Sequence, residues 1–222
     1  MKHKPEILAP AGSFESVVAA VRSGADAVYM GTKNFNARIK ADNFDDSAFS
    51  DAVDYCHSHG VRVNVTLNTL VNDGEIPEAT KTVEHICKKG AGVLILQDLG
   101  LAQLVRKLAP EMEMHASTQM SVQTVEGVKL LQKLGYKRVV LPREMTKEEI
   151  INIKNNTDAE IEIFVHGALC VCQSGMCLMS SVIGDRSGNR GLCAQPCRLP
   201  YRNGYALSLK DNCLLEHVPK LL

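Results

Sequence analysis

The stretch VRVNVTLN, from Val61 to Asn68, is followed by a helix-like segment, by Gly90 and by the apolar run VLILQD, from Val93 to Asp98. Val, Ile and Leu dominate the two runs with little alternation, which is typical of parallel strands buried on both faces. The segment between them, Pro77 to Lys89, has the pattern of an amphipathic helix, and Gly90 supplies a residue that accepts the left-handed conformation at a helix end. This stretch therefore predicts a strand, a covering helix and a second, parallel strand.

The same order of strand, helix and glycine recurs along the chain. Seven β-like runs are expected, at Glu6–Pro10, Ala27–Gly31, Val61–Asn68, Val93–Asp98, Met114–Thr118, Arg138–Pro142 and Ile161–Gly167. Helices are expected at Phe14–Ser23, Ser47–His59, Pro77–Lys89, Leu101–Leu108, Thr124–Leu134 and Lys147–Asn155. This alternation indicates an α/β fold, either a TIM-like (β/α)8 barrel or a doubly wound sheet. No GxGxxG sequence follows the first run, so a dinucleotide-binding sheet has little support.

Polar residues gather where these runs end. They are Asn64, Thr66, Asn68, Gln97, Asp98, His115, Ser117, Thr118, Gln119, Arg143, Glu144 and His166. In a barrel such residues converge on one rim, where the active site lies, so the sequence favours the barrel. The alternative for a polar residue after a strand is the N-cap of the next helix or a hydrogen bond within a loop, and Asp98 and Thr118 suit such a role.

The length is short for a complete barrel. Barrels of this kind usually need about 250 residues, whereas the chain has 222. We therefore expect one TIM-like barrel domain over residues 1–222, truncated before its last strand and without a C-terminal region. The alternative eighth strand is YALSLKD, from Tyr205 to Asp211.

Composition is that of an ordinary globular protein, with 45% hydrophobic and 23% charged residues. Lys+Arg and Asp+Glu are both 25, so the net charge of zero does not by itself indicate nucleic-acid binding. Four arginines lie in or just after the cysteine-rich segment: Arg186, Arg190, Arg198 and Arg202. They form a local basic patch or are ordinary surface arginines. The N-terminus lacks the apolar core of a signal peptide, and no apolar stretch is long enough to span a membrane. We therefore expect a cytoplasmic protein, in a compartment where disulfides are rare.

Six of the eight cysteines lie in the segment 166–213, whereas Cys56 and Cys87 stand alone in helix-like segments. The six are Cys170, Cys172, Cys177, Cys193, Cys197 and Cys213. Thiolates gathered in a reducing compartment are first interpreted as ligands of a soft metal or an iron–sulfur cluster. Zinc ribbons use two knuckles with two to four residues between ligands, and only Cys193 and Cys197 have that spacing. The dispersed set favours a [4Fe–4S] cluster over structural zinc.

Several stretches resemble the collagenase-like peptidase family, peptidase family U32. They are ILAPAG (7–12), GADAVYMG (24–31), LILQD (94–98), HASTQ (115–119), FVHGALC (164–170), SGMCLMSS (174–181), RSGNRGLCAQPCR (186–198) and LSLKDNC (207–213). The resemblance implies an N-terminal TIM-like barrel, a [4Fe–4S] cluster and oxygen-independent hydroxylation. The substrates it implies are a tRNA wobble uridine, with prephenate as co-substrate, a cytidine of large-subunit ribosomal RNA, or a ubiquinone precursor. AQPCRLPY is most similar to the ribosomal-RNA type.

Carried over to this sequence, the resemblance implies the cluster ligands Cys170, Cys177, Cys193 and Cys213, with Cys197 as the competing fourth ligand. Cys172 is then a spare thiol. We expect His166 and His115 to act as acid–base or hydrogen-bonding groups and, together with Arg143, to form the catalytic set. The candidate substrate-binding residues are Asn64, Asn68, Gln119, Arg198 and Lys210. Arg143, Arg198 and Lys210 would receive a carboxylate or a phosphate.

Two other functions stay open. The family name suggests a peptidase, although the chain has no HExxH sequence, no GxSxG sequence and no evident Cys/His dyad. The other is an accessory or structural metal-binding role. RNA is the expected partner, and association into a homo- or hetero-oligomer is left open.

Overall fold

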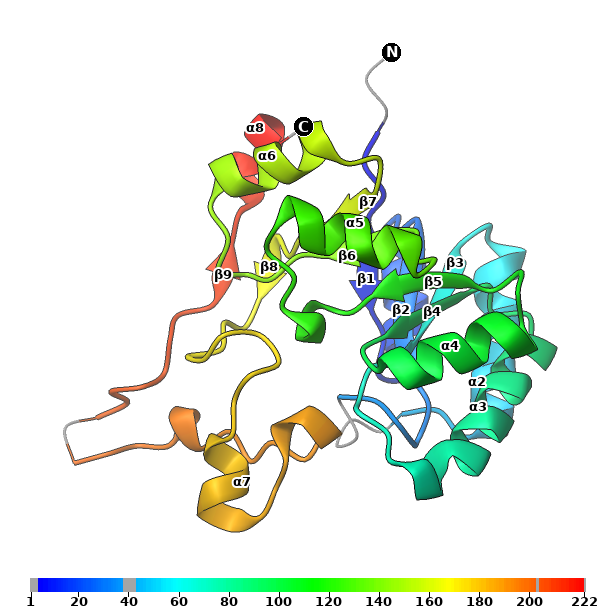
Figure 1. The fold of residues 1–222 in the computed structure, drawn as a ribbon, viewed down its shortest axis with the longest axis horizontal. Helices are drawn as coiled ribbons and strands as arrows, with labels where there is room; N and C mark the ends of the chain where they lie inside the picture. Colours follow the sequence, from blue (N-terminus) through cyan, green and yellow to red (C-terminus); the bar gives the residue numbers. More distant parts are fainter. Residues whose placement is uncertain (1–3, 38–42, 203, 222) are drawn as a thin grey trace. The chain divides into compact units, whose positions relative to one another are not determined.

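The computed structural model describes residues 4–37, 43–202 and 204–221. The chain divides into two compact units, residues 1–115 and 116–222. Each unit contains parallel strands followed by helices (Figure 1). In the described part of the chain, no helix has both the length and the apolar character needed to cross a membrane.

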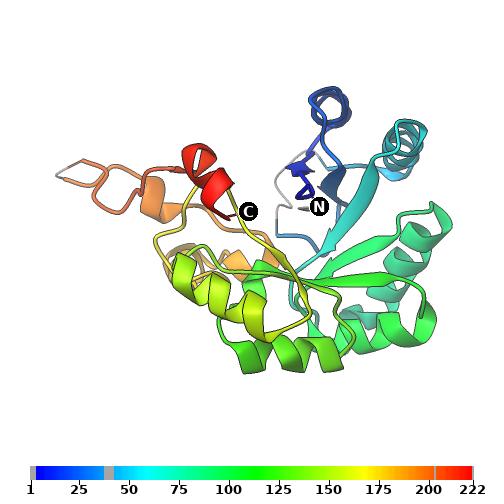
Figure 2. The same cartoon turned by 90° about the horizontal axis from the view of Figure 1, so that it is seen from above.

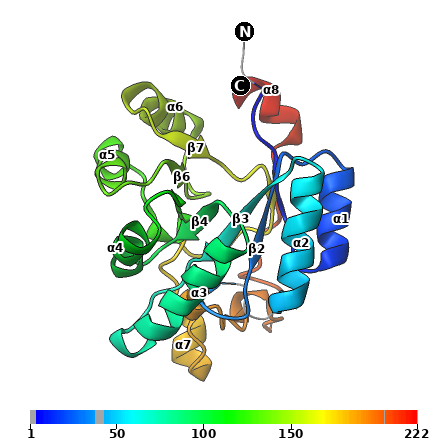
Figure 3. The ribbon, with the colours of Figure 1, turned by 90° about the vertical axis from the view of Figure 1, so that its right-hand side faces the viewer.

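The first unit holds a ladder of parallel strands covered by helices. Its elements are β1 (Leu8–Pro10), α1 (Phe14–Arg22), β2 (Ala27–Gly31), α2 (Asp46–Ser58), β3 (Arg62–Leu67), η1 (Asp73–Glu75), α3 (Ile76–Lys88), β4 (Val93–Leu96), α4 (Leu99–Leu108) and β5 (Glu113–Ala116). In the register Ala27 pairs with Arg62, and Asn64 pairs with Val93. Figure 3 shows α1 and α2 side by side next to β2. Val17, Phe49 and Val83 are buried on the inner faces of α1, α2 and α3, which is why these amphipathic helices stay on the sheet.

The second unit begins with the same pattern and then departs from it. Its elements are η2 (Thr118–Met120), α5 (Val125–Lys133), β6 (Arg138–Val140), α6 (Lys147–Asn156), β7 (Glu160–Glu162), β8 (His166–Gly167), α7 (Met179–Gly184), η3 (Gly188–Arg190), η4 (Pro196–Arg198), β9 (Asn212–Cys213), η5 (Leu215–His217) and α8 (Val218–Leu221). Strands β6 and β7 are parallel, with Arg138 opposite Glu160. Helices α5 (green) and α6 (yellow-green) lie side by side in Figure 2.

Local sequence signals set the ends of these helices. The side chains of Ser13, Asp45, Asp98, Thr124 and Thr146 cap the N-termini of α1, α2, α4, α5 and α6. The N-cap alternative for Asp98 is therefore confirmed, since its carboxylate accepts from the Leu101 amide at 2.8 Å. The expected glycine stops are also confirmed, because Gly24, Gly60, Gly90 and Gly135 all have positive φ values.

The order of the strands decides between the two expected architectures. Strands β1 to β7 follow one another in chain order, and β1 with β2, β2 with β3, β3 with β4 and β6 with β7 pair in parallel. A doubly wound sheet has a point where the strand order reverses, so this alternative is wrong. The α/β class is confirmed, and the strand order is the one that a (β/α)8 barrel also has.

Two expectations near the end of the chain are wrong. The run Ile161–Gly167 is not one strand, because β7 ends at Glu162 and β8 pairs antiparallel with β9 in a separate two-stranded sheet. The alternative eighth strand at Tyr205–Asp211 is not a strand either; the paired residues are Asn212 and Cys213, directly after it. Both differences arise from a long-range pairing between segments too short to show a period in the sequence.

Candidate functional site

The six cysteines of the segment 166–213 all lie in the second unit, on loops and short elements. Cys170 and Cys213 are exposed, and Cys172, Cys177, Cys193 and Cys197 are half-buried. All eight cysteines of the chain are free thiols. The thiol positions are therefore set by loop contacts rather than by a long helix or strand.

Electrostatic interactions connect five of these thiols through Cys172 and Cys197. Burial raises the pKa of the Cys172 thiol, and the neighbouring Cys177 and Cys170 raise it further. Burial likewise raises the pKa of Cys197, with added contributions from Cys170 and Cys193. Cys170 is common to both groups, so the thiols form one continuous set, hereafter the thiol set: Cys170, Cys172, Cys177, Cys193 and Cys197.

Backbone contacts explain how distant parts of the thiol set meet. Gly188 lies between two of its members, since a Cβ there would be 3.7 Å from both the Cys177 carbonyl oxygen and the Cys193 Cβ. The Ala194 amide donates to the Ser180 hydroxyl at 2.9 Å, which ties the Cys193 loop to α7. Among the described residues, however, no three His, Cys, Asp or Glu side chains are placed to hold a metal ion.

Arg198 links the two ends of the cysteine segment. Its Nη2 donates to the Leu169 carbonyl at 2.8 Å, and its Nη1 donates to the Leu209 carbonyl at 2.7 Å and the Ser208 hydroxyl at 2.9 Å. Leu169 precedes Cys170 and Arg198 follows Cys197, so the guanidinium brings these two cysteines together. In this conformation its donors bind the protein itself rather than an open anion site.

His166 lies on the small antiparallel sheet rather than at the end of a parallel strand. It pairs with Cys213 across the sheet, and both residues are exposed. Strands β8 and β9, which carry them, are labelled in Figure 1. The Leu214 amide donates to the Val165 carbonyl at 2.8 Å, which holds this pairing in place. The structure therefore brings together a predicted catalytic histidine and a predicted cluster ligand.

Three further candidates of the second unit are also placed. The Arg143 guanidinium lies 3.9 Å from the centre of the Phe164 ring, a cation–π contact. Gln119 belongs to η2, and Lys210 is exposed in the loop before β9. Arg143 lies between β6 and α6, and Lys210 lies two residues before β9; their binding roles stay predictions.

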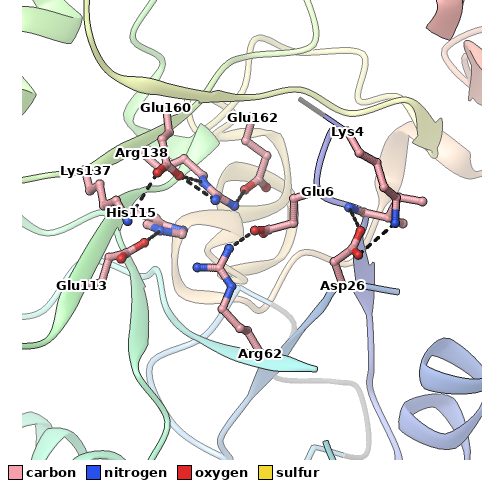
Figure 4. Close-up of polar contacts among 11 residues, drawn as sticks. Lys4, Glu6, Asp26, Arg62, Glu113, His115, Lys137, Arg138, Glu160 and Glu162 are labelled. Atoms are coloured by element: carbon pink, nitrogen blue, oxygen red, sulfur yellow. Dashed lines mark hydrogen bonds and ion pairs between the residues drawn. The ribbon is translucent and has the colours of Figure 1, made fainter. Parts of the chain in front are cut away.

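The candidates of the first unit are Asn64, Asn68 and His115. Asn64 is 1% exposed, and neither atom of its amide has a hydrogen-bond partner among the described residues. The Asn68 side-chain oxygen accepts from the Ala37 amide at 2.9 Å. His115 is fully buried, and its Nε2 lies 2.7 Å from Glu113 Oε1 (Figure 4).

A charged network on β6 and β7 was not identified from the sequence. Arg138 is 8% exposed and makes hydrogen bonds of 2.7 and 3.0 Å to Glu160, with Glu162 at 3.6 Å (Figure 4). Burial favours the protonated form of Glu160, but Arg138 and Lys137 outweigh it and lower the pKa of that carboxyl. Burial raises the pKa of Glu162. The alternation of charge in EIE, beside the arginine of RVV, is the signal that indicates such a face.

A cleft in the first unit was also not identified from the sequence. It has a volume of about 770 Å³ and is bordered by the start of α2 and by α3. Its lining residues include Lys33, Asn34, Asp46, Glu78, Lys81 and His85. Asn34 donates to Glu78 at 2.7 Å, so part of this polar lining is already paired.

The profile of peptidase family U32 matches residues 12–222. The chain belongs to this family. The family resemblance carried by the cysteine segment is thereby confirmed. A solved structure, the U32 peptidase Mk0906, aligns with a TM-score of 0.68 over 92% of this chain and 83% of its own, at 15% identity. At that identity the similarity shows the fold alone.

Some curated relatives are named for RNA hydroxylation, and others are named as proteases. The chain is 40% identical over 95% of its length to the 23S rRNA 5-hydroxycytidine C2501 synthase of Escherichia coli. It is 34% identical over 99% of its length to the tRNA hydroxylation protein P1 of Bacillus subtilis. A Porphyromonas gingivalis relative, 32% identical over 94% of this chain, is named a collagenase. The chain spans 33%, 56% and 52% of the lengths of these three relatives.

Proposed function

We propose that this chain carries the cluster-binding part of an enzyme that hydroxylates an RNA base without oxygen. The observation that supports this proposal most is the thiol set, in which Cys172 interacts with Cys170 and Cys177, and Cys197 interacts with Cys170 and Cys193, in one unit of a U32 family chain. The names of the two relatives that act on ribosomal RNA and tRNA support the substrate class. The chain-order sheet supports a (β/α)8-type barrel as the scaffold.

The donors of the thiol set suit a [4Fe–4S] cluster in kind. Thiolates on loops are the usual ligands of such clusters, and a bound cluster would supply one-electron chemistry. Cys170, Cys177 and Cys193 are the proposed ligands. Because no three donors are placed to hold an ion in the described residues, cluster binding requires the loops around them to close.

The fourth ligand is either Cys213 or Cys197. Cys197 interacts with Cys170 and Cys193, whereas Cys213 lies opposite His166 on β9. Iron content of the Cys197→Ser and Cys213→Ser variants separates the two, because only the true ligand is needed for a complete cluster. Cys177→Ser should lose the cluster in either case, and Cys87→Ser, on α3, is the matched control that should retain it.

The predicted catalytic and substrate-binding residues complete the proposal. We propose that His166 and His115 act as acid–base or hydrogen-bonding groups, with Arg143 in the catalytic set. Lys210 and Arg143 would receive the carboxylate of a co-substrate such as prephenate, or a phosphate of RNA. Asn64, Asn68 and Gln119 would orient the substrate. The bonds that Arg198 makes within the protein support a role in holding the cysteine segment rather than its predicted role in binding an anion.

The RNA substrate can be identified in cells. The gene is removed, and hydroxylated pyrimidine nucleosides of purified ribosomal RNA and tRNA are measured by mass spectrometry. We expect one hydroxylated nucleoside to disappear, to return with the wild-type gene and to stay absent with Cys177→Ser. A strain that cannot make prephenate tests the co-substrate in the same way. Unchanged nucleosides in both RNA classes would contradict the proposal.

Hydrolysis of protein is the second candidate. One relative is named a collagenase, and Cys213 of β9 pairs with His166 of β8; a thiol and an imidazole are the two groups that a thiol peptidase uses. Iron-free protein that degrades gelatin, and loses this activity in the Cys213→Ala variant, would support it.

A further inference from the structure

Ser174 is buried in the middle of an otherwise accessible cysteine loop. The loop runs from Cys172 to Cys177, and Ser174 is 6% exposed although Gly175 and Met176 beside it are more accessible. All three polar groups of Ser174 are bound, two of them by Glu144. The Ser174 amide donates to Glu144 Oε1 at 3.0 Å, and the hydroxyl lies 3.2 and 3.3 Å from the two carboxylate oxygens. The carbonyl accepts from the Ser121 hydroxyl.

Gly175, the next residue, allows the loop to pack closely against the backbone of Gln119. Gly175 has a φ of +76°, and a Cβ at this position would be 2.8 Å from the carbonyl carbon of Gln119. Real side chains do not approach a backbone so closely, so a larger residue would push the loop away from η2. The Met176 amide donates to the Gln173 carbonyl at 3.1 Å and closes the turn that leads to Cys177.

The residues that hold the loop are themselves fixed. Glu144 follows β6, and the Leu141 amide between them donates to the Glu162 carbonyl of β7 at 2.9 Å. Ser121 has a left-handed backbone, with φ of 52°, which residues other than glycine rarely adopt. The Thr118 hydroxyl reaches the Leu141 carbonyl at 3.4 Å, so the two supporting loops contact each other. These contacts therefore fix the position of the Cys172–Cys177 loop relative to β6 and β7.

A carboxylate that accepts from a backbone amide and a hydroxyl of one residue makes charge-assisted bonds, which are stronger than neutral ones. Groups that orient a metal ligand without touching the metal commonly decide whether the site forms. We infer that Glu144 is a positioning residue, which fixes the Cys172–Cys177 loop so that Cys177 is presented to the cluster. This inference rests on the proposed cluster, and it adds a residue outside the ligand set to that site.

Two disruptive variants, one conservative variant and two matched controls test the inference in the full chain. Glu144→Ala removes the acceptor, and Gly175→Ala adds the obstructing Cβ. Glu148→Gln changes an acidic residue in the first turn of α6, and Gly184→Ala adds a Cβ that meets nothing within 4 Å. The first readout is hydrogen exchange of the Ser174 amide in iron-free protein. We expect the Ser174 amide of Glu144→Ala to exchange about tenfold faster than that of the wild type. In both controls this amide should exchange at the wild-type rate.

The second readout is iron per chain with the EPR spectrum of the reduced protein. We expect reduced iron and an altered spectrum in Glu144→Ala and Gly175→Ala. Glu144→Gln should recover most of both, because its amide oxygen can still accept from the Ser174 amide. Unchanged exchange in Glu144→Ala, or faster exchange with unchanged iron and spectrum, would overturn the inference. Iron-free wild-type protein would instead contradict the proposed function, while the exchange rate would still decide whether Glu144 holds the loop.

Discussion

Cys56 is a single thiol whose burial has a measurable consequence. It lies on α2 with no exposed surface, and burial raises its pKa from 9.0 to about 11. The protonated, neutral thiol is the form that suits an apolar core, because the thiolate would lose its hydration there. The folded state therefore holds this proton more tightly than the unfolded chain does.

This difference predicts a loss of stability in alkali. The contribution of Cys56 is complete below pH 9 and is lost as the pH rises through 9 toward 11, by about 2 kcal/mol at pH 10.5. Urea denaturation of wild type and Cys56→Ala at pH 8 and pH 10.5 measures it. The alanine variant should lose less stability over this range, whereas Cys213→Ala should behave as wild type. Equal losses in wild type and Cys56→Ala would contradict the prediction.

Substitution of Asn64 can distinguish a structural role of its buried amide from a role in orienting the substrate. A buried amide without partners costs stability, by about 1–3 kcal/mol, so replacement by the similarly shaped leucine should leave the protein as stable or more stable. If the amide orients the substrate, Asn64→Leu should reduce RNA hydroxylation at least about tenfold. Asn68→Leu is the control, since it removes the acceptor of the Ala37 amide and should destabilise the protein. Lower stability with full activity in Asn64→Leu would show a purely structural amide.

At the scale of the elements, the sequence predicted what short-range patterns encode. The apolar runs gave the first six strands, and Asp98 and the glycines gave helix ends. The β8–β9 pairing was missed because His166 and Cys213 are far apart in the chain and each segment is two residues long. The bonds from Glu144 to Ser174 and from Arg198 to Leu169 were missed for the same reason. Cysteine spacing indicated the thiol set but not its supporting contacts.

The charged network of β6 and β7 gives a prediction for these elements. Arg138→Met should destabilise the protein by about 3–5 kcal/mol, because Glu160 and Glu162 would be left without their buried cation. Lys137→Met should cost at most about 1 kcal/mol, since the Lys137 side chain is 52% exposed. Urea denaturation compares the two, and adding Glu162→Gln to Arg138→Met should recover part of the loss. Equal losses of stability in Arg138→Met and Lys137→Met would contradict the role of Arg138 as the buried cation of this network.

At the scale of the whole molecule, the thiol set belongs entirely to one compact unit. The net charge of zero means that any attraction to RNA must come from local groups rather than from the chain as a whole. The chain spans only part of each curated relative, and the activity proposed here concerns the whole protein. Variants of Cys56 and Asn64, in the first unit, should therefore leave the iron content of the protein unchanged.

The proposed function depends most on the thiol set binding a [4Fe–4S] cluster. The most direct measurement is the iron, acid-labile sulfide and zinc content of protein purified under nitrogen, together with its visible spectrum. We expect about four irons and four sulfides per chain, with a broad absorption at about 400 nm that bleaches on reduction. One zinc per chain without sulfide would contradict it and would make a structural or hydrolytic role the better explanation.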